Sequence, residues 1–400
     1  MKLVSMPKTA LKWTVDSLKQ RWDRVRWSGL YTDLHRNLDP DVHLRESIEW
    51  LKRAQDFGDD RGVSYGTRFG QGFQLSYPET TGYIICTFVA LSRILQVTEY
   101  LERAIEMGLW EIAVQMDSGA VMGGYVQSNP TPAVFNTGQV LLGWASLYET
   151  TRDDRFAKAG ERACAWLMSV QEPSGHWVRG NSEYAAKDST LYNVKAAWGL
   201  AEMGRALGNE EAVRAAVRNA EYTVARQAPN GWFPDCCLSD SRQPLLHAIG
   251  YTMQGLVGIG ILTGRQDFID AAARTADKLL KLMDSQGFIP GRINSSMVGT
   301  VKWCCLTGTA QTSIVWSQLY ELKPRPEYSE AVHRANRYLM ARHDIESPDP
   351  AVRGGMAGSW PVWGDYCPFM ILNWATKFFV DALIAERRIA APNTVATTDA

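Results

Sequence analysis

Two adjoining stretches decide the fold: Asn136–Glu149, NTGQVLLGWASLYE, and Asp154–Gln171, DRFAKAGERACAWLMSVQ. The first is apolar on nearly every side, which is typical of a helix buried in a core. The second has apolar residues three or four positions apart with charges between them, which predicts a helix with one wet face. A short link joins them, so we expect an inner helix and an outer helix lying side by side.

The opening of the inner helix recurs along the chain near Thr80, Asn136, Tyr192, His247, Thr307 and Asn373, at intervals of 56, 56, 55, 60 and 66 residues. A period of this size is typical of a repeated unit of two helices. We expect outer helices over 42–57, 97–116, 153–170, 209–227, 265–284 and 326–343. We expect inner helices over 79–96, 136–150, 191–207, 247–263, 307–321 and 372–387. The sequence therefore predicts an all-α fold, an (α/α)6 barrel or six-hairpin toroid, with an extra N-terminal helix.

Each helix pair needs its neighbours to bury its apolar face, so the repeat predicts one toroid domain over residues 40–388. An N-terminal helical extension over 1–39 and a flexible tail over 389–400 complete the predicted organisation. The links from outer to inner helices are long, and the links from inner to outer helices are short. All six long loops must then lie at the barrel end where the inner helices begin, and long loops often carry function. We expect a pocket at that end.

Composition excludes several classes of protein. The net charge is -1 and the hydrophobic fraction is 46%, so no overall field favours nucleic acid. The N-terminal residues lack an apolar stretch long enough for a signal peptide, and we expect no membrane span. Seven cysteines include the vicinal pairs Cys236–Cys237 and Cys304–Cys305, without the CxxC spacing of common zinc sites. We expect a cytoplasmic protein with reduced thiols, no metal and no cofactor, and we leave the oligomeric state open.

Three long loops begin with a similar pattern of a polar residue, a glycine and an aromatic ring. The pattern reads QEPSGHW over Gln171–Trp177, QAPNGW over Gln227–Trp232 and DSQGF over Asp284–Phe288. It resembles the loops of α/α-toroid carbohydrate-active enzymes, namely unsaturated glucuronyl hydrolases, α/α-barrel polysaccharide lyases and glucuronyl C5-epimerases. The resemblance covers about residues 40–388 and implies a poly- or oligosaccharide substrate, although no catalytic motif of these families matches residue by residue. Terpenoid cyclases share a related pattern.

The segment Tyr77-Pro78-Glu79 gives the sharpest local signal for chemistry. Proline suits the first turn of a helix, which places Glu79 at the start of an inner helix and on the pocket floor. The positive end of the helix dipole favours the ionised carboxylate. We therefore expect Glu79 to act as a base or to accept from a sugar hydroxyl, rather than as a general acid. Tyr77 could donate a proton beside it.

Further candidates lie in the same rim. His247 opens the fourth inner helix, and Asp235 and Asp365 lie in long loops, so these three join Glu79 and Tyr77 as candidate catalytic residues. Asn136 has the side chain of a helix N-cap. We expect substrate to contact polar and aromatic residues of the helix openings and the last loop: Tyr83, Asn136, Gln139, Tyr192, Asn193, Lys195, Tyr251, Lys302, Trp303, Gln311, Arg353, Trp360, Trp363, Tyr366, Asn373 and Trp374.

The candidates fit more than one reaction. Glycoside hydrolysis needs two carboxylates, which Glu79 with Asp365 or Asp235 could supply, and we favour this reading. The long loops also carry cations that suit a uronate-containing substrate: Arg68, Arg179, Lys187, Arg292, Lys302 and Arg353. A polysaccharide lyase or uronate C5-epimerase would instead use a tyrosine or histidine base. A terpenoid-cyclase-like toroid is a further alternative, for which a DDxxD or DxDD motif would be expected, and the sequence contains neither. A non-catalytic glycan-binding toroid is the remaining alternative.

Overall fold

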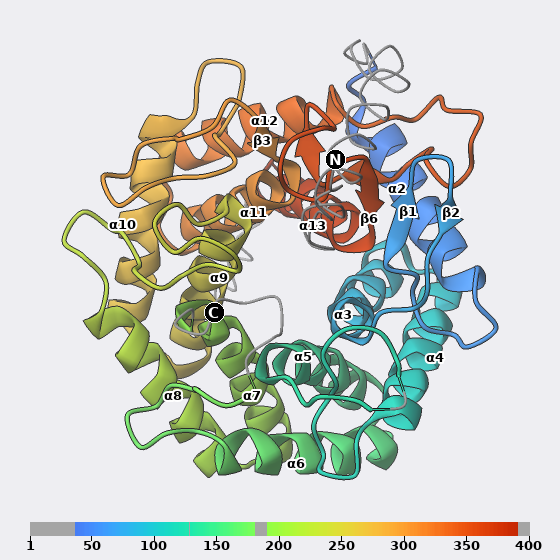
Figure 1. Cartoon of the computed structure of the whole chain (residues 1–400), viewed down its shortest axis with the longest axis vertical. Helices are drawn as coiled ribbons and strands as arrows, with labels where there is room; N and C mark the ends of the chain where they lie inside the picture. Colours follow the sequence, from blue (N-terminus) through green and yellow to red (C-terminus); the bar gives the residue numbers. More distant parts are fainter. Residues whose placement is uncertain (1–36, 128, 181–189, 391–400) are drawn as a thin grey trace, which may run out of the picture.

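The computed structural model describes residues 37–127, 129–180 and 190–390, and these form a ring of helical hairpins (Figure 1). The outer helices are α2 (Pro40–Asp56), α4 (Thr98–Val114), α6 (Asp154–Ser169), α8 (Glu210–Ala225), α10 (Gln266–Leu282) and α12 (Pro326–Met340). The inner helices are α3 (Pro78–Leu95), α5 (Val134–Thr151), α7 (Val194–Leu207), α9 (Leu246–Thr263), α11 (Leu306–Leu322) and α13 (Asn373–Ala390). The predicted toroid of six hairpins is confirmed.

Differences from the predicted boundaries are small. The third inner helix starts with a single 3-10 turn, η1 (Leu191–Asn193), before α7 begins. Helix α13 continues to Ala390, two residues into the predicted tail. The predicted helix near the N-terminus and the tail from Ala391 lie outside the described residues.

Inner helices approach each other closely where the sequence places small residues. A side chain at Gly199 would put its Cβ 1.9 Å from the carbonyl oxygen of Gly138, on the neighbouring helix α5. A Cβ added at Gly138 would likewise lie 2.3 Å from the Cα atom of Ala196 on helix α7. The contact of α5 with α7 therefore depends on missing side chains, which explains why the inner helices are rich in glycine and alanine.

The repeated pattern at the loop openings has an architectural role. The Gln171 side-chain amide donates to the carbonyl oxygens of Gly175 (2.9 Å) and of Ala215 on the next outer helix (2.9 Å), and its oxygen accepts from Arg218 (3.1 Å). Gln227 forms the equivalent bonds one repeat later, with Gly231 and Ala271. The pattern that carries the family resemblance thus fastens one hairpin to the next.

A threonine in the first turns of an inner helix holds the returning loop. The Thr137 hydroxyl donates to the Ala133 carbonyl (2.7 Å) and accepts from the backbone N–H of Val121 (2.9 Å). Thr376 makes the same two bonds in the sixth repeat, to Leu372 and from Met356. These bonds fix where the second and sixth long loops enter the barrel end, and so they position the residues that follow.

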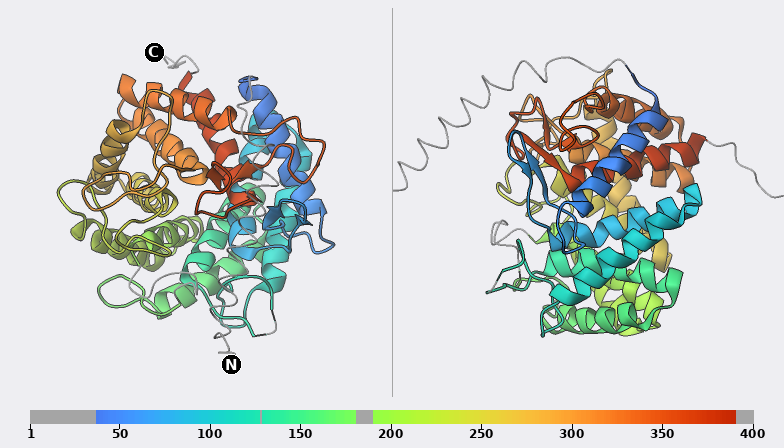
Figure 2. Two further views of the ribbon diagram at one scale, coloured as in Figure 1. Left: turned by 45° about the horizontal axis from the view of Figure 1, so that its top comes forward. Right: turned by 90° about the vertical axis from the view of Figure 1, so that its right-hand side faces the viewer.

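Short strands close the ring at that end, where Figure 2 shows the loops and strands gathered. Strands β1 (Gly66–Arg68), β2 (Gly72–Phe73), β4 (Met356–Ala357) and β6 (Met370–Leu372) form a sheet in the order β2-β1-β6-β4. The antiparallel pair β1–β6, with Thr67 opposite Ile371, joins the first repeat to the sixth. A second pair joins β3 (Cys304–Cys305) to β5 (Ser359–Trp360). The last loop is therefore a packed seam of the ring.

Helix α9 is long and apolar enough to cross a membrane by length and composition, but 83% of it is buried inside the protein. This is the pattern of a core helix, because the apolar residues contact the neighbouring inner helices.

Candidate functional site

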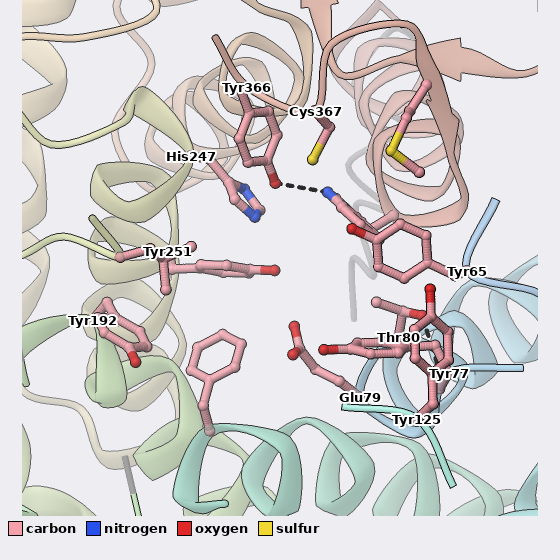
Figure 3. Close-up of a pocket in the computed structure, with 14 residues that line it drawn as sticks. Tyr65, Tyr77, Glu79, Thr80, Tyr125, Tyr192, His247, Tyr251, Tyr366 and Cys367 are labelled. Atoms are coloured by element: carbon pink, nitrogen blue, oxygen red, sulfur yellow. Dashed lines mark hydrogen bonds between the residues drawn. The ribbon is translucent and has the colours of Figure 1, made fainter. Parts of the chain in front are cut away.

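A cavity of about 380 Å³ opens at the barrel end where the inner helices begin (Figure 3). Its size falls within the range of small-molecule sites. Most of its wall is aromatic, and its lining comes from several repeats: Tyr65, Tyr77, Glu79, Thr80, Tyr125, Phe135, Tyr192, Leu238, His247, Tyr251, Tyr366, Cys367, Met370 and Trp374. The predicted pocket thus lies at the predicted end of the barrel.

The aromatic rings form two opposed walls. On one side, Tyr65 packs edge-on against Tyr77 (ring centroids 5.2 Å apart) and Trp374 (4.6 Å). On the other side, Tyr251 packs against Phe135 (4.7 Å) and His247 (4.2 Å). Three of these four contacts are edge-to-face and the fourth, His247 against Tyr251, is tilted, and such contacts hold the rings in fixed orientations. The cavity is therefore a preformed slot with ring faces and hydroxyl groups along its sides.

Glu79 lies between the two walls, and its carboxyl group points into the cavity (Figure 3). Helix α3 begins at Pro78, so Glu79 occupies the first turn as predicted. Burial raises the pKa of its carboxyl group to about 8, and no cation or hydrogen-bond donor among the described residues offsets that burial. The expectation that the helix dipole keeps Glu79 ionised is wrong, because the cost of burying the charge is larger than the gain from the dipole. Near neutral pH, Glu79 is a proton donor.

His247 lies across the cavity at the start of α9. Its Nδ1 is 2.7 Å from Oε1 of Gln311, whose amide nitrogen donates in turn to Gln254 (3.3 Å). Because the Gln311 oxygen can only accept, Nδ1 of His247 carries the proton in this hydrogen-bond network, and Nε2 is left as an unprotonated acceptor. Burial lowers the pKa of the ring to about 4. At neutral pH, His247 is therefore an uncharged base.

Tyrosine hydroxyls supply the remaining polar groups of the cavity. Burial raises the pKa values of Tyr65, Tyr251 and Tyr366 well above 10, so all three stay protonated. Tyr366 accepts a hydrogen bond from Nε1 of Trp374 (2.8 Å). The hydroxyl of Tyr192 is buried and has no hydrogen-bond partner in the described part of the chain. The site can thus donate hydrogen bonds to a ligand from several directions.

Of the residues predicted from sequence, seven line the cavity: Glu79, Tyr77, His247, Tyr192, Tyr251, Tyr366 and Trp374. Gln311 lies behind His247 and positions it. Tyr83, Gln139, Asn193 and Lys195 are buried in the inner helices and are not among the lining residues.

Asn136 and Asn373 have structural roles. Helix α5 begins before Asn136, so Asn136 is not the N-cap, and its side-chain amide donates instead to the carbonyl of Met122 (2.8 Å). Asn373 donates to the Ser64 carbonyl (2.8 Å) and to the Thr80 hydroxyl (2.7 Å). Both amides hold a loop to an inner helix, because a loop carbonyl entering the barrel needs a donor there.

The two carboxylates proposed as partners of Glu79 lie outside the cavity lining. Asp365 forms an ion pair with Arg292 (2.8 Å) and its side chain is 64% exposed. The Asp235 residue has a positive φ of 51°, and its carbonyl accepts from the backbone N–H of Thr190 (3.1 Å). The structure therefore does not bring either aspartate into the described cavity lining beside Glu79.

The remaining predicted contacts lie in the rim or outside it. Lys302 is exposed, and Arg353 lies against Glu46 of helix α2 (3.7 Å). Trp303, Trp360 and Trp363 are partly buried and pack against the core rather than lining the cavity. Lys187 falls outside the described residues. Over the described ranges, no group of three His, Cys, Asp or Glu residues could hold a metal ion.

Half of the described lining residues are not among those predicted from the sequence: Tyr65, Thr80, Tyr125, Phe135, Leu238, Cys367 and Met370. Tyr65 and Tyr125 lie in the first two long loops, so aromatic residues in those loops were a usable signal. Leu238, Cys367 and Met370 carry no such signal, because only the path of the loops brings these apolar side chains to the cavity.

No family model matches the sequence. Solved structures with the same fold include carbohydrate-active enzymes. An unsaturated glucuronyl hydrolase specific for heparin has a TM-score of 0.70 at 14% identity, covering 88% of this chain and 97% of its own. A cellobiose 2-epimerase from Bacillus thermoamylovorans has 0.67 at 12% identity, covering 86% and 98%. A polysaccharide lyase has 0.63 at 12% identity, covering 88% and 98%. The resemblance seen in the sequence is thereby confirmed for the fold.

Proposed function

We propose that this protein is a carbohydrate-active enzyme that transfers protons with Glu79 as general acid and His247 as general base. One observation carries the proposal: an unpartnered, protonated carboxyl group and an uncharged imidazole line the same tyrosine-walled cavity. A general acid and a general base need opposite protonation states at one pH, and these two groups have them between about pH 4 and pH 8. The sugar-processing enzymes that share the fold support a sugar as substrate.

The electrostatics favour a reaction that passes through an anion, namely epimerisation or elimination at a carbon next to a carbonyl group. In the first step, Nε2 of His247 takes the carbon-bound proton and the electron pair moves toward the carbonyl oxygen. Nearby tyrosine hydroxyls donate hydrogen bonds to that oxygen, where negative charge develops. Epimerisation ends when Glu79, across the cavity from His247, gives its proton to the opposite face of the carbon, and proton exchange with solvent then restores neutral His247 and protonated Glu79. Elimination ends when the neighbouring C–O bond breaks and the leaving oxygen takes the proton of Glu79.

Glycoside hydrolysis is the second candidate, because a carboxylic acid with a raised pKa is what protonation of a glycosidic oxygen requires. His247 would then activate the attacking water. The oxocarbenium-like transition state is positive, however, and a nearby carboxylate ordinarily assists it. The described lining holds no second carboxylate. Hydrolysis therefore ranks below proton transfer at carbon.

The aromatic walls would also suit a terpenoid cation. Protonation of an alkene calls for a strong acid, whereas burial makes Glu79 a weak one, with a pKa of about 8. The cavity also presents several hydroxyl groups that a hydrocarbon cannot use. These two features favour a sugar over an isoprenoid chain.

Solvent exchange in D2O tests the proposal. Purified protein is incubated with uronate-containing polysaccharides and with reducing oligosaccharides, and products are followed by NMR. We expect deuterium on a ring carbon or a new unsaturated sugar, with losses of about 10²- to 10⁴-fold in Glu79→Gln and His247→Gln. Asp365→Asn is the matched control outside the cavity. New reducing ends without deuterium or unsaturation would establish hydrolysis instead, and full activity in Glu79→Gln would remove Glu79 from the mechanism.

A further inference from the structure

The described lining of the cavity carries no fixed positive charge. None of the described lining residues is an arginine or a lysine. Apart from tyrosine hydroxyls and one cysteine thiol, the ionisable groups of this lining are Glu79 and His247, and both are uncharged near neutral pH. A carboxylate that entered this slot would lose its water without gaining a cation, which is costly in a closed aromatic site. This absence is unexpected for a toroid whose loops are rich in basic residues.

Four of those basic residues have other positions in the described part of the chain. Arg292 binds the exposed carboxylate of Asp365, and it also donates to the Gln243 carbonyl (3.1 Å) and the Ser239 hydroxyl (3.3 Å). It therefore ties three long loops together and is not open to a ligand. Arg353 faces Glu46 on the outer helix, and Arg179 and Lys302 are exposed to solvent.

Two amines are buried in the inner helices, but neither lines the cavity. Lys377 is paired with Asp381 one turn along α13 (2.6 Å). Lys195 lies over the ring of Trp198, with its Nζ 4.0 Å from the ring centroid. Both amines thus lie inside the barrel among the inner helices, outside the described lining of the cavity.

The geometry points to an uncharged sugar unit as the occupant of this cavity, rather than a free uronate. This inference rests on the proposed function and narrows it. The group that acidifies the carbon-bound proton must then be a neutral carbonyl. Two sources supply one: the open-chain aldehyde or ketone of a reducing sugar, and the ester of a uronic acid. Tyrosine hydroxyls donate to its oxygen, and the ring faces pack against the C–H groups of the sugar.

A binding experiment separates the sources. Three disaccharides with one skeleton are compared at pH 6, where Glu79 is protonated and His247 is neutral: cellobiose, its counterpart with glucuronate as one unit, and the methyl ester of that glucuronate. Matching sets use galactose and mannose skeletons. Binding to the wild-type protein is measured by saturation-transfer NMR and calorimetry. We expect the neutral or esterified member of at least one set to bind at least tenfold more tightly than its free uronate.

A charge-introducing variant tests the cause. Leu238 is a partly exposed loop residue of the lining, so Leu238→Arg would place a guanidinium in the cavity, and Leu238→Gln is the uncharged control. We expect Leu238→Arg, shown to be folded by circular dichroism, to shift preference toward the free uronate about tenfold relative to Leu238→Gln. Equal or tighter binding of the free uronate by the wild type, or no shift in Leu238→Arg, would overturn the inference while leaving the proposed function in place. Failure of every sugar to bind would overturn the proposed function itself.

Discussion

Nδ1 of His247 lies 2.7 Å from Oε1 of Gln311, on the neighbouring inner helix α11. This bond decides which face of the imidazole can react, because it assigns the proton to the buried nitrogen and leaves Nε2 unprotonated. The bond also raises the pKa of the ring against the larger lowering effect of burial. Gln311 is thus a positioning residue that sets both the orientation and the basicity of His247.

Substitution of Gln311 should move the pKa of His247 in either direction. In Gln311→Glu, a carboxylate accepts from Nδ1 and raises that pKa. In Gln311→Met, the acceptor is lost and the pKa falls below about 4. The two variants should therefore shift the acidic limb of the pH profile of kcat/KM in opposite directions. Identical profiles in both variants would show that the bond has no influence on the base.

The wild-type profile of kcat/KM should be bell-shaped. Activity needs neutral His247 and protonated Glu79, so it should fall below about pH 4 and above about pH 8. A glutamine cannot ionise, so the residual activity of Glu79→Gln should lose the alkaline limb. Steady-state kinetics across this range, with the fold checked by circular dichroism at each pH, make the measurement. An alkaline limb that persists in Glu79→Gln would assign it to another group.

Glu79 should make the protein less stable as the pH rises. Its carboxyl pKa is about 8 in the folded state and 4.5 in the unfolded chain, so the stability present below pH 4.5 is lost as the pH approaches 8. Between pH 5 and pH 8 the expected loss is up to about 3 kcal/mol in the free energy of unfolding. Urea unfolding of wild type and Glu79→Gln at both values checks this. The same pH dependence in both proteins would contradict the raised pKa.

The loop aspartates should be dispensable for activity. Asp365 is largely exposed, and Arg292 keeps its bonds to Gln243 and Ser239 without it. We expect Asp365→Asn to lower stability by less than about 1 kcal/mol, as for other exposed ion pairs, and to keep activity within a few-fold. Asp235→Asn should behave alike, because the hydrogen bonds that hold its loop are accepted by its backbone carbonyl and not by its side chain. A loss of activity as large as that of Glu79→Gln would return either residue to the mechanism.

A side chain added at Gly175, in the connection between two hairpins, should lower the stability of the protein. Its φ is 93°, and an added Cβ would lie 2.5 Å from the carbonyl oxygen of Arg218 on the next outer helix. We expect Gly175→Ala to cost about 3 kcal/mol, from backbone strain and a clash that the helix cannot relieve. Gly208 is the matched control, since its φ is 68° but no atom lies within 4 Å of an added Cβ. Gly208→Ala should cost about 1 kcal/mol, and equal melting temperatures for both variants would rule out the clash.

The toroid could be predicted from the sequence because the spacing of apolar residues within each helix is local and the helix pairs repeat along the chain. Stretches such as Asn136–Glu149 and Asp154–Gln171 each reveal their burial from residue spacing alone, and the twelve predicted inner and outer helices all overlap helices of the structure, with ends that differ by at most three residues. The same spacing placed Glu79 and His247 at the starts of inner helices, and so in one cavity. It could not exclude Asp365, since the direction of a loop side chain depends on partners such as Arg292, far away in the chain.

By itself, the sequence determined the ring of hairpins, the end at which the long loops meet and the helix openings that face the cavity. Only the tertiary structure decided the protonation of Glu79 and His247, because a pKa depends on what surrounds the group and not on what precedes it in the chain. The helix dipole at Glu79 can be predicted from its position, whereas much of the aromatic wall around its carboxyl group comes from rings of other repeats, among them Phe135, Tyr192 and Tyr251. Burial by those rings makes Glu79 an acid.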